Sequence, residues 1–394
     1  MPPDSPSIVA GLLAVNTGSS SVKLALYNNG AQLTELCRMS VEPIGAPGCR
    51  LRVTPEPATG SDLPIDARDH RTALLRALDY AHNSLGFPVE AVGHRVVHGG
   101  AIHQSPERIT AALLSDLQGL ASIDPDHMPQ ALEAIEAITG RYPAVPQVAC
   151  FDTAFHRTMP MLAQRYPLPT WTSEAGVRRY GFHGLSCEFI MSRLTQLEPQ
   201  TLGGRLLIAH LGNGASITAV RHGASVDTTM GFSPTGGLMM GTRCGDLDPT
   251  VMTYLARTAH RDFESLDRLV NHESGLLGVS GSSSDVRVLL ANESPSARAA
   301  LELFCYTARK HLGALAAILD GVDTIVFTGG IGEHALAVRE RICRELGYLG
   351  VRLDSEANAG NREVISASDS AVMVRVIATD EELVIAKHVR QLLL

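Results

Sequence analysis

Residues 151–160 read FDTAFHRTMP and follow the short apolar run Val148-Ala149-Cys150. Such a run is typical of the end of a buried strand, and Asp152 places a carboxylate at its carboxyl end. Open α/β sheets bind their ligands beyond the carboxyl ends of their strands. The stretch therefore favours an α/β fold with its chemistry near Asp152. Taken alone, Asp152 is an equally good N-cap for a following helix.

Two segments on either side of this stretch share one design: a strand, a turn of small residues and a second strand. In residues 8–27 the turn is Asn16–Ser21 (NTGSSS), and in residues 205–220 it is His210–Ser216 (HLGNGAS). Turns of this kind expose backbone N–H groups that can bind phosphate, although a plain Gly/Ser turn is the alternative. We expect a weak internal duplication with one phosphate-facing hairpin in each half.

Glycine-rich stretches mark three further positions. Met230–Pro249 and Gly275–Asp285 are expected to be functional loops, and the strand Thr324–Phe327 is expected to open into a glycine loop at Thr328–Glu333. Periodicity predicts helices over residues 70–85, 109–120, 130–139 and 299–319, a strand over 89–97, and a last strand at 374–377 before a terminal helix.

Composition bounds the class of protein. The chain has 394 residues, of which 45% are hydrophobic and 19% charged, and its mean hydropathy is +0.07. It is long enough for two domains with full cores. A net charge of -8 disfavours nucleic-acid binding. Seven dispersed cysteines without a C-x-x-C pair indicate reduced thiols. Residues 1–7 lack a signal-peptide pattern and no apolar run spans a bilayer, so we expect a soluble cytoplasmic protein without a membrane partner.

Charged side chains beside glycines are the candidate ligands. Arg95, in GHRVVHGG, suits bidentate binding of a carboxylate or phosphate. His94 and His98 in the same segment are possible metal ligands, but the sequence offers no third ligand nearby. The motif YGFHG is expected to present Phe182 and His183 on a tight loop.

Residues 324–354 also imitate a dinucleotide-binding fingerprint, which predicts an NAD-dependent oxidoreductase. A strand leads into Gly330, Gly332 and Ala335, and Asp354 follows at a plausible ribose distance. However, only about forty residues follow Asp354, too few for the second mononucleotide half of that fold. This alternative also leaves Arg95 and the two small-residue turns unexplained, so we favour a phosphoryl-transfer enzyme.

A series of motifs along the chain resembles those of the acetate kinase family, which belongs to the wider acetate/propionate kinases. In chain order they are NTGSSSVK, GHRVVHGG, FDTAFHRTMP, YGFHG, HLGNGASI, MGTRCGDLDP, SGLLGVSG, GGIGE and TDEELVIA. The resemblance runs from about residue 12 to the end, closely from residue 93 and loosely between 28 and 88.

The resemblance implies an α/β fold of two duplicated actin-like ATPase (ribonuclease H-like) domains with a nucleotide cleft between them. Residues 1–151 with 379–394 would form an acyl-substrate and phosphate domain closed by the C-terminal helix. Residues 152–378 would bind the nucleotide.

The activity implied is reversible, Mg²⁺-dependent phosphoryl transfer from ATP to acetate, giving acetyl phosphate and ADP, in a cytoplasmic homodimer. Mn²⁺ is a possible substitute for Mg²⁺. A propionate or other short-chain carboxylate kinase is the nearest alternative. A chaperone or sensor of the same superfamily would use the ATP loops but would have no use for an arginine clamp opposite them.

Site residues carry over motif by motif. The catalytic group would be Arg95, His127, Asp152, His183 and Arg243. The acyl substrate would contact Arg95, Val97, Phe182 and Pro234. Mg²⁺ would be held through waters by Asn16 and Glu381. ATP would contact Lys23, His210, Leu211, Gly212, Asn213, Gly214, Asp285, Val286, Arg287, Gly330, Ile331, Gly332, Glu333 and His334.

Elementary chemistry fits these roles. A carboxylate acceptor is already ionised near neutral pH, so the reaction needs no strong general base. It needs alignment of two anions and neutralisation of charge in the transition state. We therefore expect Asp152 to orient an arginine or the magnesium shell rather than to remove a proton.

The chain departs from the family pattern at three motifs. A-P-L-H-N-P becomes Asp124–Pro129 (DPDHMP), P-L-E-G becomes Pro234–Gly237 (PTGG), and G-I-G-E-N ends in His334. Asp126 replaces the usual Leu beside the acyl methyl group. Because an unpaired buried carboxylate there is costly, we expect Asp126 to turn away from the pocket and propionate to be accepted.

Overall fold

The computed structural model describes residues 11–55, 62–199 and 203–393, so the predicted apolar residues 8–10 lie outside the described part. The chain divides into two compact units. Unit 1 comprises Met1–Ala154 with Asp380–Leu394, and unit 2 comprises Phe155–Thr379. The sequence-based division falls after residues 151 and 378, and the structural one after Ala154 and Thr379.

Unit 1 contains an eight-stranded sheet in the order β5-β4-β3-β2-β1-β6-β8-β7. The strands β1, β2 and β3 are successively antiparallel, whereas β1, β6 and β8 run parallel. The strand bounds are β1 Gly11–Thr17, β2 Val22–Asn29, β3 Leu33–Glu42, β4 Arg50–Thr54, β5 Asp62–Pro64, β6 Val89–Val96, β7 Glu107–Arg108 and β8 Gln147–Phe151.

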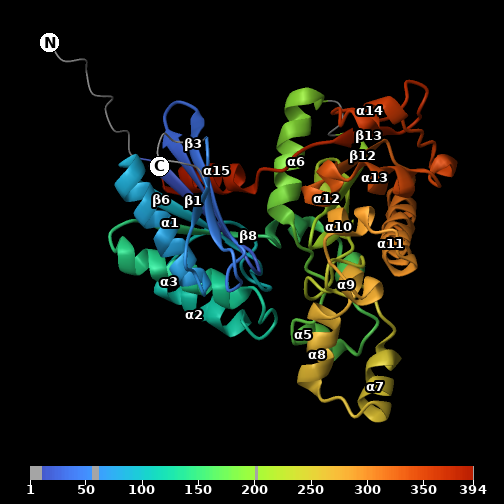
Figure 1. Ribbon diagram of the computed structural model, residues 1–394, viewed down its shortest axis with the longest axis horizontal. Coiled ribbons are helices and arrows are strands. Elements are labelled where there is room, and N and C mark those ends of the chain that lie inside the picture. The colour runs from blue at the N-terminus through green and yellow to red at the C-terminus, as the bar shows by residue number, and fades with distance from the viewer. Residues whose placement is uncertain (1–10, 56–61, 200–202, 394) are drawn as a thin grey trace. The chain divides into compact units, whose positions relative to one another are not determined.

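Helices cover both faces of this sheet (Figure 1). They are α1 His70–Leu85, α2 Ala111–Leu120, α3 Met128–Arg141 and α15 Glu381–Leu393. The helices α1 and α3 share one apolar cluster with β1 and β2. On the other face, α15 packs on β1 and β6, and it does so closely because Gly93 has no side chain. A Cβ at Gly93 would lie 2.3 Å from Cγ2 of Ile385, so this glycine admits the C-terminal helix.

Unit 2 repeats the central part of that sheet. Its order is β11-β10-β9-β12-β13, with β9, β10 and β11 successively antiparallel and β9, β12 and β13 parallel. This is the order and polarity of β3-β2-β1-β6-β8, so the predicted duplication is confirmed. The strand bounds are β9 Arg205–Leu211, β10 Ala215–Arg221, β11 Ala224–Thr228, β12 Thr324–Thr328 and β13 Met373–Val376.

Helices of unit 2 flank its sheet (Figure 1). The helix α6 packs on Leu206 and Ile208 of β9, and α11 contacts β9, β10 and β11. The helix bounds are α4 Met161–Gln164, α5 Thr170–Glu174, α6 Gly184–Leu197, α7 Pro249–Thr258, α8 Phe263–His272, α9 Gly275–Ser280, α10 Val286–Ala291, α11 Pro295–Leu319, α12 Gly329–His334, α13 Leu336–Cys343 and α14 Ser355–Ala359.

Two predicted glycine loops are wrong, because the glycines bracket short helices. Gly275 (φ 62°) and Gly281 (φ 64°) lie in the left-handed region on either side of the turns of α9. Gly329 (φ 74°) likewise opens α12 directly after β12. In contrast, residues 230–248 contain neither helix nor strand, as predicted.

The dinucleotide-binding alternative, in which Asp354 would bind a ribose, is also wrong. Its Oδ1 accepts hydrogen bonds from the N–H groups of Glu356 (2.9 Å) and Ala357 (3.0 Å) at the start of α14. The carboxylate is therefore a helix cap and not a ribose ligand.

Candidate functional site

Unit 1 places an arginine and an aspartate together at one edge of its sheet. Arg95 lies on β6 and Asp152 directly follows β8, the neighbouring parallel strand. Nη2 and Nε of Arg95 donate to Oδ2 of Asp152 at 2.5 and 3.0 Å. Asp152 is 0% exposed, and its backbone N–H donates to the Val96 carbonyl at 3.0 Å. Since its carboxylate bonds to Arg95, the N-cap interpretation of Asp152 is wrong.

Asn16 joins this pair to the C-terminal helix. Its Oδ1 accepts from Nη1 of Arg95 at 3.2 Å. Its Nδ2 donates to Oε2 of Glu381 at 2.9 Å and to Oε1 of Glu382 at 2.8 Å. The predicted residues Asn16, Arg95, Asp152 and Glu381 therefore come together, and we call them, with Glu382, the Arg95 cluster.

Glu382 is a member of this cluster that sequence reasoning missed. It lies next to Glu381 in the motif TDEELVIA, is buried, and also pairs with Arg38 at 2.9 Å. The sequence signal that could have identified Glu382 is the pair of adjacent glutamates, Glu381 and Glu382. Two acids in the first turn of α15 are favoured by the helix dipole.

The Arg95 cluster carries more buried acid than base. Burial raises the pKa of Glu381 to about 7; Asp152 and Glu382 raise this pKa further, whereas Arg95 and Lys23 lower it. The pKa of Arg95 is lowered by burial, but the charges of Asp152 and Glu381 more than offset this effect. An additional cation near these carboxylates would relieve their mutual repulsion.

The donor set fits a magnesium ion held through waters. Oδ1 of Asp152 is buried and has no hydrogen-bond partner among the described residues, so it can accept from a water of a hydrated cation. Mg²⁺ retains several of its waters when proteins bind it. Within residues 11–55, 62–199 and 203–393, no three His, Cys, Asp or Glu side chains have the spacing of a directly coordinated metal.

His94, which the sequence offered as a possible metal ligand, instead bonds to a buried side chain. Its Nε2 bonds to Oε1 of Gln147 at 2.7 Å, and burial lowers its pKa to about 4. Gln147 in turn donates to Oγ1 of Thr139 at 2.8 Å. His94 is thus a neutral member of a buried polar chain.

His127 lies immediately before α3 and contacts an acid that the sequence did not single out. Its Nδ1 is 2.8 Å from Oδ1 of Asp124, and Asp124 is only 4% exposed. Asp126 is partly exposed, and Val97 is buried.

In unit 2 the motif YGFHG presents His183 in a strained backbone conformation. His183 has a φ of 58° and precedes α6. His156, from the stretch FDTAFHRTMP, holds this turn: its Nε2 bonds to the Phe182 carbonyl at 2.9 Å and its Nδ1 to Oγ of Ser225 at 3.0 Å. A non-glycine residue in the left-handed region costs about 1–3 kcal/mol, and the buried His156 helps to impose that conformation.

The side chains of His183 and Arg243 converge over the β9–β10 turn. Nδ1 of His183 bonds to Oγ of Ser216 at 2.9 Å, and its ring stacks on His210 with centroids 4.1 Å apart. A Cβ at Gly214 would lie 3.2 Å from Nε2 of His183 and 2.9 Å from Nη2 of Arg243. The glycine of this turn therefore leaves room for both groups.

The loop that carries Arg243 is closed by its own hydrogen bonds. Nη1 of Arg243 donates to the carbonyl of the buried Pro234 at 2.7 Å. The N–H of Gly237 (φ 91°) donates to Oδ1 of Asp246 at 2.8 Å. The change from PLEG to PTGG thus still gives an ordered loop.

The β12–α12 turn is held by the carboxylate of Glu333. Its Oε1 accepts from the N–H groups of Gly329 (2.9 Å) and Thr379 (3.1 Å). Gly330 faces open space, and the His334 side chain is 75% exposed. Glu333 therefore shapes the predicted nucleotide loop, and Gly330 leaves it accessible.

Other predicted nucleotide contacts lie at the start of α10. Asp285 caps this helix, accepting from the Arg287 N–H at 2.8 Å, and its carboxylate is 2.6 Å from Nη2 of Arg287. Val286 is buried. The role of these residues in ATP binding stays a prediction, as does that of Lys23, which is exposed on β2.

Glu381→Gln tests the charge balance of the Arg95 cluster. Because the pKa of Glu381 rises from 4.5 to about 7, the folded chain binds an extra proton between these pH values, and its stability falls as pH rises through that range. Glutamine stays neutral and can still accept from Asn16. The variant should unfold at a higher temperature than the wild type at pH 8, and at nearly the same temperature at pH 5.

Thermal unfolding followed by circular dichroism at both pH values measures this effect. Glu136→Gln, which changes an exposed glutamate on α3, is the matched control and should change neither value. A Glu381→Gln variant that is less stable than the wild type at pH 8 would contradict the charge balance described here.

The sequence of this chain is similar to that of known acetate kinases. Residues 11–387 match the Acetokinase family. Acetate kinase of Rhodopseudomonas palustris is 44% identical over 391 residues, covering 97% of this chain and 98% of the relative. Acetate kinase of Methylocella silvestris is 43% identical over 396 residues, covering 97% and 98%.

The fold is also similar to the solved structures of kinases for short carboxylates. A Porphyromonas gingivalis acetate kinase has a TM-score of 0.86 at 37% identity, covering 98% of this chain and all of that one. A Francisella tularensis propionate kinase has a TM-score of 0.90 at 34% identity with the same coverage. These likenesses confirm the prediction of two actin-like ATPase domains. The chain therefore belongs to the acetate kinase family.

Proposed function

We propose that this chain transfers the γ-phosphoryl group of ATP to acetate, reversibly, to give acetyl phosphate and ADP. Its family makes it a phosphotransferase with a carboxyl acceptor and ATP as donor. The observation that carries the proposal is Arg95, whose side chain is 15% exposed and is held from two sides by Asp152 and Asn16. A fixed guanidinium recognises a carboxylate with little loss of entropy.

The acceptor carboxylate attacks phosphorus without prior loss of a proton, because it is already ionised at neutral pH. The obstacle is repulsion between the acceptor and the triphosphate. Arg95 offsets the acceptor charge, and Asp152 keeps Arg95 in position. Asp152 thus acts by orientation and not as a general base.

Arg243 and His183 would stabilise the charge of the phosphoryl group during transfer. Both converge over Gly214, where a phosphate can approach the backbone of the β9–β10 turn. Electrostatic stabilisation by groups fixed in advance is the main source of catalysis in phosphoryl transfer. We assign most contacts of the nucleotide to unit 2 and the carboxylate of the acyl substrate to Arg95 of unit 1.

Mg²⁺ would be held through waters by Asn16 and Glu381, close to the buried Oδ1 of Asp152. When bound, the ion would neutralise phosphate charge during transfer, and Mn²⁺ would be able to replace it. Asn16 bonds to Glu381 and to Arg95. Its amide group therefore fixes the positions of both side chains, and Asn16 and Glu381 would orient the waters of the ion.

We also infer a homodimer in the cytoplasm. Large apolar side chains on α7 and α8 are exposed, including Tyr254 (58%) and Phe263 (91%), and exposed apolar patches mark interfaces. None of the seven cysteines, all of which lie in the described residues, forms a disulfide bond, which suits a reducing compartment. Among the described residues no helix is both long and apolar enough to cross a bilayer.

Hydroxamate detection of acyl phosphate tests the function. With ATP and Mg²⁺, acetate should give acyl phosphate, and propionate should be used within about tenfold of acetate, the scale of one methylene group. Formate and butyrate complete the series. ATP hydrolysis without acyl phosphate would instead favour a chaperone or sensor, and a marked preference for propionate would favour the propionate kinase alternative.

Arg243→Ala and Gly214→Ala separate catalysis from binding. Arg243→Ala should lower kcat on the order of 10²-fold or more and change the KM for ATP little, because the interaction exists mainly in the transition state. Gly214→Ala should lower kcat as well, since its methyl group displaces the ends of His183 and Arg243, while the melting temperature is kept.

Gly347→Ala is the control, because a Cβ there meets no atom within 4 Å. Steady-state kinetics and thermal unfolding on all three variants supply the data. An Arg243→Ala enzyme that keeps most of its kcat would make Arg243 a structural loop residue only.

A further inference from the structure

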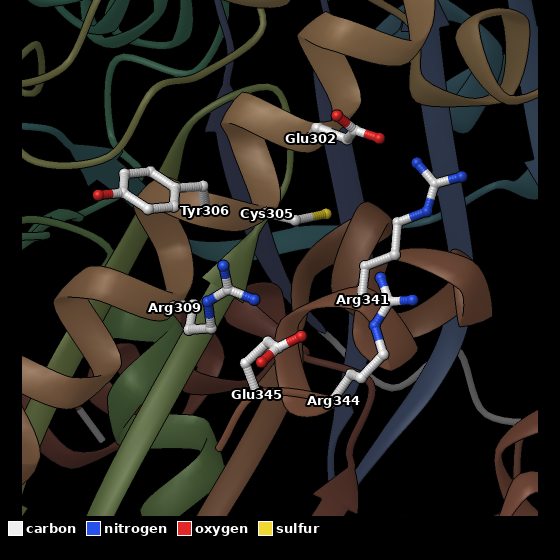
Figure 2. A pocket seen from close by; sticks show the side chains of 7 residues that line it. All are labelled: Glu302, Cys305, Tyr306, Arg309, Arg341, Arg344 and Glu345. Carbon is white, nitrogen blue, oxygen red and sulfur yellow. The ribbon is translucent and has the colours of Figure 1, made fainter. Parts of the chain in front are cut away.

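Unit 2 has a hollow of about 510 Å³ between α11 and the end of α13. Figure 2 shows its lining, with Arg309 on one side of Cys305 and with Arg341 and Arg344 on the other. The remaining lining residues are Glu302, Tyr306 and Glu345. This volume is that of a site for a metabolite-sized ligand.

Helical spacing explains the lining. Glu302, Cys305, Tyr306 and Arg309 occupy positions i, i+3, i+4 and i+7 of α11, so they share one face. The positions 341, 344 and 345 repeat this spacing on α13 and the turn beyond it. The hollow is therefore built by two packed helices and not by a mobile loop.

Three guanidinium groups face this hollow without internal partners. Within the described part of the chain, no side-chain hydrogen bond or ion pair engages the guanidinium groups of Arg309, Arg341 and Arg344. The Arg309 guanidinium carbon lies 5.8 Å from the centre of the Tyr306 ring, which supports it at the wall. Three arginines against the two glutamates of the lining, Glu302 and Glu345, leave a net positive charge, which favours an anionic ligand.

Cys305 does not make this a reactive thiol site. Burial raises its pKa to about 11, although Arg341, Arg309 and Arg344 each lower it. The thiol therefore stays protonated at neutral pH.

The helix α13 connects this hollow to the nucleotide loop. Arg339, two residues before Arg341, is fully buried. Its Nη1 donates to the carbonyls of Gly332 (2.8 Å) and Glu333 (2.9 Å) in α12, and its Nε donates to Oδ1 of Asn358 at 2.9 Å. A shift of α13 would therefore be transmitted to the backbone of Gly332 and Glu333.

We propose that this hollow binds a metabolite-sized organic anion with at least two phosphate or carboxylate groups, and that its occupancy alters the use of ATP. The arginines would bind the anionic groups, and Glu302 and Glu345 would accept hydrogen bonds from ligand hydroxyl groups and weaken the binding of simple inorganic anions. Only the effect on ATP rests on the proposed function; the binding site does not.

Isothermal titration of the full chain, saturated with Mg·ADP to block the nucleotide site, tests the binding. Fructose 1,6-bisphosphate probes hydroxylated phosphates, tricarballylate probes carboxylates, and inorganic phosphate probes simple anions. At least one organic probe should bind with a Kd on the order of 1 mM or below, and more tightly than inorganic phosphate. The double variant Arg341→Gln/Arg344→Gln should weaken this binding at least about tenfold, by loss of two charge-assisted contacts.

Arg362→Gln, an exposed arginine of unit 2 outside the hollow, is the control for net charge and should bind like the wild type. Absence of binding by every probe, or equal binding to the double variant, would overturn the site. A changed sedimentation coefficient of the double variant would also overturn it, because the hollow would then be a contact between copies of the chain.

Kinetics test the coupling. The bound probe should change the KM for ATP at least about twofold in the wild type and not in the double variant, whose activity without probe should be unchanged. Binding without any change in KM would overturn the coupling. A wild type that forms no acyl phosphate without probe would refute the proposed function and leave the titration result intact.

Discussion

The ion pair between the partly buried Arg95 and the fully buried Asp152 is the interaction on which the rest of unit 1 depends. It joins the ends of two parallel strands, and through Asn16 it reaches the first turn of the C-terminal helix. Removing one partner of such a pair leaves an uncompensated buried charge and costs about 3–5 kcal/mol. The pair therefore makes the position of Arg95 part of the fold, and the excess of carboxylates around it leaves room for a further cation.

The two units share one sheet topology but place different charges at corresponding ends of their strands. At the ends of β6 and β8, unit 1 gathers Asp152, Glu381 and Glu382 around Arg95, which suits a carboxylate substrate and a hydrated metal ion. At the β9–β10 turn, unit 2 gathers His183 and Arg243 around glycine, which suits phosphate. Duplication explains the shared backbone, and the difference in charge explains why each half of a phosphoryl-transfer reaction can be assigned to one unit.

Much of this arrangement was predictable, and the rest depends on tertiary contacts. Alternating apolar residues around small-residue turns identified both hairpins, and motif resemblance identified Asn16, Arg95, Asp152 and Glu381 before their contacts were known. The glycine-rich composition of residues 275–281 and 329–334 wrongly predicted loops. Composition does not distinguish a glycine loop from a short helix that begins or ends at a left-handed glycine. The contact between Asp124 and His127 spans only three residues and could have been considered from the sequence. The arginine hollow arises from the packing of α11 on α13, which no local pattern encodes.

The pH–rate profile of Asp152→Asn tests most directly whether Asp152 orients Arg95 or removes a proton. If it orients, the variant is severely impaired at every pH, and its pH–rate profile keeps its position on the pH axis. Disappearance of the acid limb would instead identify Asp152 as the general base and contradict the orienting role assigned to it.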